Sequence, residues 1–298
     1  MPRPRPFCAD ESRALGEQLH ATASRVDHWL LIEYRSLWSH DAFAGSGLSE
    51  QVKQHLRDQQ AARPRTRLLF IRSRARRGAP RLAAYSATSR EREFDLRRVE
   101  FDSYTDLLGL DLAGGAGEPV DHPLLLVCTH GKHDPCCALY GRPLYDALAD
   151  ELEPDWIWQC THVGGDRFAG NLVCLPRGLY YGRLDGASAS AALDELLADR
   201  IYLEPYRGRS CYPFAVQAAE RAVREDTGLL GLDELQLVAA NRRNDGAWTV
   251  AISARGRGIQ EVDLREEHGE LEHLTCSSEE LRRPRRYVVT ARRARPGV

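Results

Sequence analysis

The feature that most constrains this chain is a pair of cysteine- and histidine-rich segments, each of which begins where an apolar run ends. The segment CTHGKHDPCC (residues 128–137) follows LLLV, and CTHVGGDRF (residues 160–168) follows WIWQ. A short apolar run is typical of a buried strand, and α/β folds place ligands at the edge where such strands end. The sequence therefore predicts a sheet in which two strand ends carry reactive side chains.

The elements expected around these segments follow the order of a thioredoxin-like domain. We expect a strand, a helix, a second strand, a hairpin and a helix at residues 124–128, 142–152, 156–162, 171–184 and 187–199. A further helix is expected at 213–226. We assign residues 120–230 to this thioredoxin-like domain, of the α/β (α+β) class.

The first half of the chain shows a related order of elements. A strand at 28–34 precedes a helix at 50–59, which Ser49 should cap. Strands at 68–72 and 82–87 are expected to pair around the turn RRGAP, and short helices are expected at 10–22 and 104–110. One interpretation is that residues 1–112 form a degenerate second copy of the thioredoxin-like domain, although no residue-level repeat is visible. The run AGGAGEP (residues 113–119) is the expected linker.

The remaining residues, 231–298, contain short alternating segments. Those at 235–241, 248–254, 259–265, 271–276 and 287–291 have the composition of strands separated by turns. They predict a small antiparallel sheet that packs on the core or extends it.

Composition and charge exclude several classes of protein. The net charge is −2, and the basic groups at 72–77 and 282–286 are short, so we expect solvated faces and no nucleic-acid partner. No apolar run reaches the ~18 residues of a membrane span, and the N-terminal segment lacks a signal-peptide pattern. We therefore expect a cytoplasmic protein without membrane contact. In that compartment its eight cysteines would serve metal binding, redox chemistry or packing.

The sequence over residues 124–184 resembles the sucrase/ferredoxin-like family, whose members carry a thioredoxin-like ferredoxin domain. The resemblance rests on CTHGKHDPCC, GRP, the run WQCTHVGGDRFAGN and YGRL, and it extends into the first half through RVDHWLLIEY and LWSHDAFAGSGL. It implies a [2Fe–2S] cluster. In the best-understood branch of the family, two cysteines spaced C-x8-C and two histidines spaced H-x3-H hold that cluster.

Carried over to this chain, the resemblance places the cysteine pair on Cys128 and Cys137 and the first histidine on His162. The second histidine position holds Asp166, an oxygen donor, whereas iron–sulfur sites are normally built from thiolate or imidazole. Three interpretations stay open: Asp166 is the fourth ligand, Cys160 supplies a thiolate instead, or the domain holds no cluster and serves as a scaffold. Three further residues are candidates as well: His130, His133 and Cys136. Each would either bind the metal in place of one of these ligands or lie next to the ligands and orient them.

The residues themselves also suit a metal centre. Thiolate and imidazole donors together select iron–sulfur clusters or zinc. Gly164 and Gly165 allow a tight turn directly after His162. The positive charges of Lys132 and Arg167 would balance the negative charge of a cluster.

Four classes of function are compatible with these residues, and an electron carrier with an unknown redox partner protein is favoured over a catalyst. A thiol-redox protein would need a C-x-x-C motif at the first strand end, which is missing. A zinc-stabilised binding module has suitable donors but untypical spacing, and sugar hydrolysis has no recognisable carboxylate pair. Cys174 is expected in the core. Three isolated cysteines are expected to be inert thiols: Cys8, Cys211 and Cys276.

Overall fold

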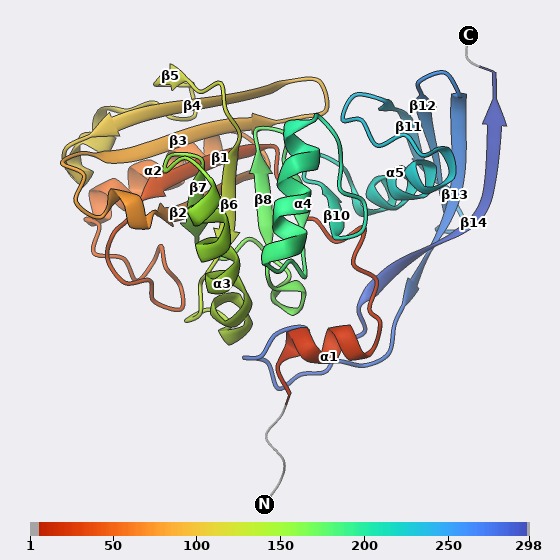
Figure 1. Cartoon of the computed structure of the whole chain (residues 1–298), viewed down its shortest axis with the longest axis horizontal. Helices are drawn as coiled ribbons and strands as arrows, with labels where there is room; N and C mark the ends of the chain where they lie inside the picture. The colour runs from red at the N-terminus through yellow and green to blue at the C-terminus, as the bar shows by residue number, and fades with distance from the viewer. Residues whose placement is uncertain (1–5, 297–298) are drawn as a thin grey trace, which may run out of the picture.

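The computed structural model describes residues 6–296, which form a mixed α/β fold with two sheets (Figure 1). A 10-stranded sheet has the order β10-β9-β8-β6-β7-β2-β1-β3-β4-β5, and a 4-stranded antiparallel sheet has the order β11-β12-β13-β14. The larger sheet contains strands from both halves of the chain. The smaller sheet, together with α5, lies at one end of the molecule (Figure 1).

The helices and strands have the following bounds. The helices are α1 (Cys8–Ala14), α2 (Glu50–Ala62), α3 (Pro135–Glu151), α4 (Gly186–Leu197) and α5 (Phe214–Thr227), with 3-10 helices η1 (Arg74–Arg76), η2 (Tyr104–Gly109) and η3 (Asp166–Phe168). The strands of the larger sheet are β1 (His28–Glu33), β2 (Thr66–Arg72), β3 (Leu82–Ser89), β4 (Phe94–Phe101), β5 (Glu118–Pro119), β6 (Leu124–Cys128), β7 (Ile157–Cys160), β8 (Leu172–Leu175), β9 (Leu179–Tyr181) and β10 (Tyr206–Arg209). Those of the smaller sheet are β11 (Leu235–Arg242), β12 (Trp248–Ala254), β13 (Gly258–His268) and β14 (Arg285–Arg295).

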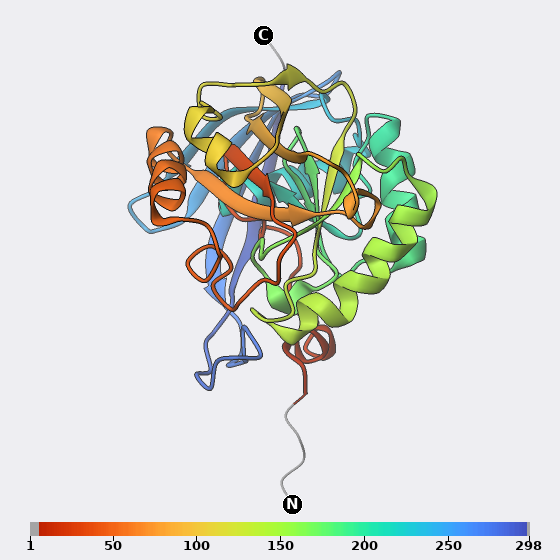
Figure 2. The same cartoon turned by 90° about the vertical axis from the view of Figure 1, so that its left-hand side faces the viewer.

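The larger sheet curls so that its inner face forms one core. Along β6 the side chains alternate between the two faces, as the period of a strand requires. Leu124, Leu126 and Cys128 pack inward with residues of β1, β2 and β7, whereas Leu125 and Val127 pack outward against α3 and α4. Helix α2 covers the outer face of β1 and β2. In the side view α2 (orange) and the pair α3 and α4 (green to teal) therefore lie on opposite sides (Figure 2).

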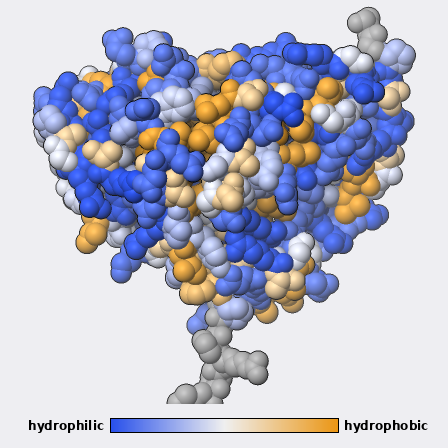
Figure 3. Space-filling view, viewed as in Figure 1, coloured by the Kyte–Doolittle hydropathy of each residue, from blue (hydrophilic) through white to orange (hydrophobic). Residues whose placement is uncertain are grey.

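The face over α3 and α4 shows mainly hydrophilic side chains, with apolar side chains in separate small groups (Figure 3). These helices direct their apolar residues, such as Leu144 and Leu193, at the sheet. Helix α3 is held against the sheet by its contacts with β6 and β7, and it also contacts α4.

Most of the expected elements are present. Strand β6 and helices α2, α4 and α5 lie where the pattern placed them, as do the hairpin of β8 and β9 and the C-terminal antiparallel sheet. Ser49 caps α2 by accepting a hydrogen bond of 3.3 Å from the backbone N–H of Val52. Cys174 is buried within β8, as expected.

Several expectations about elements are wrong. Strands β2 and β3 do not pair around the RRGAP turn, because β1 lies between them, parallel to β2 and antiparallel to β3. Helix α1 ends at Ala14, shortly before Gly16, which has φ +63°. The segment 271–276 is not a strand; its one ladder contact is an isolated bridge between Glu272 and Arg282. Strand β10 was not expected.

Helix α3 begins seven residues earlier than the sequence pattern suggested. Asp134 accepts a hydrogen bond of 2.8 Å from the backbone N–H of Cys136 and so caps the helix, and Pro135 occupies the first helical turn. Pro143 consequently lies in the helix interior. This early start places Cys136 and Cys137 on the first turn of a helix and not in a loop.

The boundary expected between the first two domains does not interrupt the larger sheet. Strand β2 of the first half pairs with β7 of the second half, with Ile71 opposite Cys160. Within the expected linker, Glu118 and Pro119 form β5 and pair with β4. The two halves therefore share one sheet and one inner core.

The contact of α3 with β6 yields a prediction about Gly141. A Cβ at this position would lie 2.0 Å from the carbonyl oxygen of Cys128, so helix and strand would have to separate. In an exposed helix Gly→Ala stabilises by about 1 kcal/mol. Here we expect Gly141→Ala to lower the free energy of unfolding by about 1–3 kcal/mol, as overpacking does.

Denaturant unfolding measures this change. Gly186→Ala in α4 is the matched control, because its Cβ would lie 3.4 Å from that of Ala147, an ordinary contact. Equal stability of the two variants would contradict the close packing of α3 on the end of β6.

Candidate metal centre

Four of the predicted site residues converge at the end of β6. Cys128 is the last residue of β6, Cys137 lies in the first turn of α3, His162 follows β7, and Asp166 begins η3. Ligand atoms of Cys128, Cys137 and His162 all lie within 4.8 Å of one another. Oδ1 of Asp166 lies 3.2 Å from Sγ of Cys137 and 2.8 Å from Nδ1 of His162. The structure thus brings the four residues into one cluster.

The sheet and the following turn explain this convergence. Strands β6 and β7 are parallel, with Cys128 opposite Cys160, so both chains leave the sheet at the same edge. Gly164 and Gly165 have φ of +97° and +84°, values that favour glycine, and they reverse the chain after His162.

A buried arginine fixes the turn that follows His162. Arg207 is 1 % exposed and donates hydrogen bonds to the carbonyl oxygen of Gly164 (3.0 Å) and to Oδ1 of Asn171 (2.6 Å). Asn171 in turn donates to the carbonyl oxygen of Gly165 at 2.8 Å. The loop that carries Asp166 is therefore held by hydrogen bonds from the adjacent strand β10.

The two thiols of the site differ in their tendency to ionise. The thiol of Cys137 interacts with Cys128 and holds its pKa well below the ordinary value. His162 also lowers this pKa, whereas burial raises it. The same interaction with Cys128, reinforced by burial, raises the pKa of Cys137 well above its ordinary value. Of the two thiols, Cys128 is therefore the one that ionises more readily.

The imidazole and the carboxylate form an ion pair. Burial disfavours the charged imidazole, but the neighbouring Asp166 carboxylate and Cys128 sulfur outweigh it and raise the pKa of His162 to about 9. Burial likewise opposes ionisation of Asp166, but His162 outweighs it and lowers the pKa of that carboxyl group. The site thus concentrates negative charge on one sulfur and one carboxylate, balanced by a single proton on an imidazole.

Additional imidazoles extend from the site toward the surface. The ring of His133 stacks on that of His162 with centroids 4.0 Å apart, and the ring of His40 lies 5.2 Å from His133. His130 contacts the carbonyl oxygen of Ser39 through Nε2 at 2.7 Å. Sequence analysis did not identify His40 as part of the site. The available signal was its place in LWSHDAFAGSGL, one of the segments that carry the family resemblance.

Other candidate residues lie elsewhere. Cys136 points away from Cys137 and lies with Cys8, Asp134 and Cys276 in a second group. Cys160 is buried beside Cys128, and burial raises the pKa of its thiol well above the ordinary value. It belongs to none of the potential ligand groups found among residues 6–296.

The two residues expected to balance the charge of a cluster are Arg167 and Lys132. Arg167 forms an ion pair of 2.7 Å with Glu17, so its charge is already balanced. Its guanidinium also lies 4.5 Å from the ring centroid of Phe168. Lys132 is exposed to solvent.

The donor set fits a soft or borderline metal. Two sulfurs and one imidazole suit iron–sulfur clusters and zinc, and a carboxylate completes a set of four. Nδ1 of His162 is buried, and its contact among the described residues is the ion pair of 2.8 Å with Oδ1 of Asp166. A buried imidazole nitrogen next to a carboxylate and two thiols is suited to binding a metal.

A family model covers the region that contains these donors. The sequence model described as Sucrase/ferredoxin-like matches residues 19–208, which is more than half of the chain. The chain belongs to the sucrase/ferredoxin-like family. All four converging residues of the site lie inside the matched region, whereas Cys8 and Cys276 lie outside it.

Two similar proteins of known name share part of this region. Over 106 residues the chain is 33% identical to Altered inheritance of mitochondria protein 32 of Eremothecium gossypii, covering 31% of this chain and 34% of the relative. Over 101 residues it is 30% identical to the protein of the same name from Meyerozyma guilliermondii, covering 30% and 36% respectively. The chain therefore spans about a third of the length of these relatives.

Two further comparisons concern the whole fold. No solved structure matches the chain with significance. Among residues 6–296, no helix combines the length and the apolar character needed to cross a lipid bilayer.

The position of Asp166 beside both Cys137 and His162 predicts its contribution to metal binding. We expect Asp166→Ala and the isosteric Asp166→Asn to lower the metal content of purified protein, because each removes the anionic oxygen donor. Cys160→Ala should keep its metal and lose about 1 kcal/mol of stability from a small cavity. Elemental analysis and thermal unfolding measure the two effects. Full metal retention in Asp166→Ala together with loss in Cys160→Ala would identify Cys160 as the ligand instead.

Proposed function

We propose that this chain is an electron-transfer protein with a [2Fe–2S] cluster held by Cys128, Cys137, His162 and Asp166. The observation that carries the proposal is the convergence of two sulfurs and one imidazole, with ligand atoms within 4.8 Å, in a member of the sucrase/ferredoxin-like family. The carboxylate beside them supplies a fourth donor where the family pattern has a second histidine. When bound, such a cluster takes up and releases one electron at a time.

The arrangement of the second half supports a thioredoxin-like interpretation, which is part of the same proposal. Helix α3 connects the parallel strands β6 and β7, β8 and β9 add to the sheet antiparallel, and α4 follows. A thioredoxin-like unit over residues 120–230 would have this order of elements. A degenerate copy in the first half stays a prediction.

The protein residues would set the electronic character of the site. Cys128 and Cys137 are each 1 % exposed, so water is excluded from the sulfurs. A neutral imidazole ligand raises the reduction potential relative to a thiolate. The carboxylate of Asp166 opposes this effect because it restores a negative charge.

The electron would enter and leave on the histidine side. The side chain of His162 is 24% exposed, whereas that of Asp166 is 8% exposed. The stacked ring of His133 widens this accessible edge. We therefore propose that a redox partner protein approaches at His162 and His133. A cytoplasmic location, with neither nucleic acid nor membrane as a partner, belongs to the same proposal.

A basic cleft beside the site suggests the charge of that partner. A cavity of about 550 Å³ is lined by five arginines: Arg35, Arg72, Arg74, Arg77 and Arg142. Its residue Gln159 accepts a hydrogen bond of 2.9 Å from Thr129, the neighbour of Cys128 in the chain. Burial and repulsion by Arg142 and Arg77 lower the pKa of Arg72. An acidic partner surface would relieve this repulsion.

Electron transfer to a small anionic acceptor tests the basic cleft. We expect reduced protein to be oxidised by ferricyanide at a rate that falls with ionic strength and falls several-fold in the double variant Arg77→Ala/Arg142→Ala. Arg257→Ala, an exposed arginine in the turn between β12 and β13, is the control. Equal oxidation rates in the wild type, the double variant and Arg257→Ala would contradict docking at this cleft.

A thiol-redox protein or a zinc-stabilised binding module is the second candidate. The observation that favours thiol chemistry is the lowered pKa of Cys128 beside the thiol of Cys137. Against it, both sulfurs are buried, and a thiolate must be accessible to attack a disulfide. Zinc would use the same donors without an electron-transfer role.

Absorption and electron paramagnetic resonance spectra, with iron and sulfide analysis of anaerobically purified protein, test the proposed function. We expect visible bands with two irons and two sulfides per chain. Cys128→Ala and Cys137→Ala should each abolish the bands, whereas Cys174→Ala should keep them and cost about 1 kcal/mol of stability. The iron–sulfur proposal would be contradicted if wild-type protein were colourless and held only zinc, or no metal, at Cys128.

A further inference from the structure

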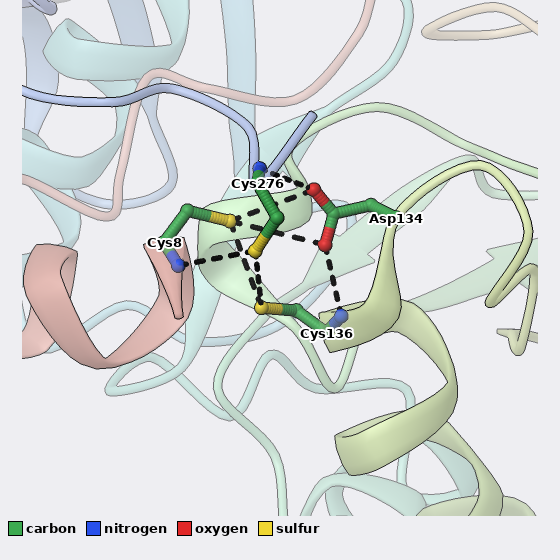
Figure 4. A group of neighbouring side chains, drawn as sticks. All are labelled: Cys8, Asp134, Cys136 and Cys276. Carbon is green, nitrogen blue, oxygen red and sulfur yellow. Dashed lines mark hydrogen bonds between the residues drawn. The ribbon is translucent and has the colours of Figure 1, made fainter. Parts of the chain in front are cut away.

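A second group of potential ligands gathers from three distant parts of the chain (Figure 4). Cys8 is the first residue of α1, Asp134 and Cys136 lie at the start of α3, and Cys276 lies in the segment between β13 and β14. One ligand atom from each of the four lies within 4.8 Å of all the others. In Figure 4 the three sulfurs and the carboxylate point toward a common centre.

The separations match a tetrahedral metal site. Sγ of Cys136 lies 3.6 Å from Sγ of Cys8 and 3.4 Å from Sγ of Cys276. Sγ of Cys8 lies 3.7 Å from Oδ2 of Asp134. A tetrahedral zinc ion with Zn–S of about 2.3 Å and Zn–O of about 2.0 Å places two sulfurs about 3.8 Å apart and a sulfur and an oxygen about 3.5 Å apart.

The charge of the group also favours a cation. Asp134 is fully buried, and Cys8 and Cys136 are at most 1 % exposed. The carboxylate accepts hydrogen bonds from the backbone N–H of Cys136 and Cys276 and from the hydroxyl of Thr275, none of which carries a positive charge. A buried carboxylate surrounded by sulfur is costly unless a positive charge compensates it.

A hydrogen bond to sulfur points the same way. The backbone N–H of Cys8 donates to Sγ of Cys276 at 3.3 Å. Such a donor stabilises negatively charged sulfur, the form in which cysteine binds a metal. A single disulfide would leave the third sulfur and the carboxylate uncompensated.

We propose that Cys8, Cys136, Cys276 and Asp134 bind one structural zinc ion. The choice of zinc follows from a closed, tetrahedral, sulfur-rich set of four donors, which is the usual form of a structural zinc site. Two of the ligands, Cys8 and Cys276, lie outside the residues that match the family, whereas Asp134 and Cys136 lie inside them. The site therefore joins the terminal segments of this chain to the shared family region.

The zinc would fasten both terminal regions to the core. Residues 269–284, which join β13 to β14, contain no helix or strand and run beside α1 (Figure 1). Helix α1 in turn contacts the loop of the first site, because Arg13 donates to the carbonyl oxygen of Ala169 at 3.1 Å. Cys136 and Cys137 are adjacent on α3 but serve different groups, so one helical turn would connect the two metal sites.

Metal analysis of purified protein tests the proposal. We expect one zinc per chain in addition to the iron of the first site. Cys276→Ser and Cys8→Ser should lose that zinc, keep their iron, and unfold at lower temperature than the wild type. Cys211→Ser is the matched control, because Cys211 is also half-buried, lies outside the family match and belongs to neither group. It should keep both metals.

A second measurement does not depend on the folding of these variants. In a Cys128→Ala background, which lacks the first site, cobalt(II) added in place of zinc should give the intense absorption of thiolate-to-cobalt charge transfer. Cobalt that gives no such absorption would overturn the proposal, as would zinc retained in both Cys8→Ser and Cys276→Ser. A disulfide between Cys136 and either partner, detected by mass spectrometry of non-reduced protein, would also overturn it. The wild-type protein could also contain zinc but no iron, and lose that zinc in Cys276→Ser. This result would overturn only the iron–sulfur function and would support the zinc site.

Discussion

The parallel pairing of β6 with β7 is the interaction on which the rest of the structure depends. It sets Cys128 directly opposite Cys160, so that the chain leaves both strands at the same edge of the sheet. Everything proposed for the first site follows from that edge. Cys128 ends one strand, His162 follows the other, and α3, which joins the two strands, brings Cys137 back over the end of β6. Gly141 permits this return because no side chain separates the helix from the strand.

The start of α3 is the second constraint, and it links the two ligand groups. Asp134 caps the helix and at the same time accepts hydrogen bonds from the segment that carries Cys276. Successive helical residues are rotated by about 100°, so Cys136 and Cys137 face different directions. One faces the terminal segments and the other faces the inner core. A pair that looked redundant in the sequence therefore supplies one sulfur to each group.

Both groups concentrate negative charge in the interior. In the first, the imidazole of His162 compensates the carboxylate of Asp166 at 2.8 Å. In the second, the hydrogen-bond partners of Asp134 are uncharged. The carboxylate of the first group therefore has a charged partner within the protein, whereas that of the second has only neutral hydrogen-bond donors. The two proposals are also separable experimentally, since one concerns iron and the other zinc.

Local pattern was sufficient for several elements, because the apolar run of β6 and the cap at Ser49 are short-range signals. The grouping of Cys128, Cys137 and His162 was predicted from the family resemblance, and the folded chain brings these three residues together. Strand order was decided only by tertiary structure: β1 separates β2 from β3, and β7 joins the two halves, because pairing partners are chosen by burial of the inner face and not by adjacency in the chain. The second group shows the same limit. Cys8 and Cys276 looked isolated because 268 positions of sequence separate them, and only the folded chain brings them to Cys136.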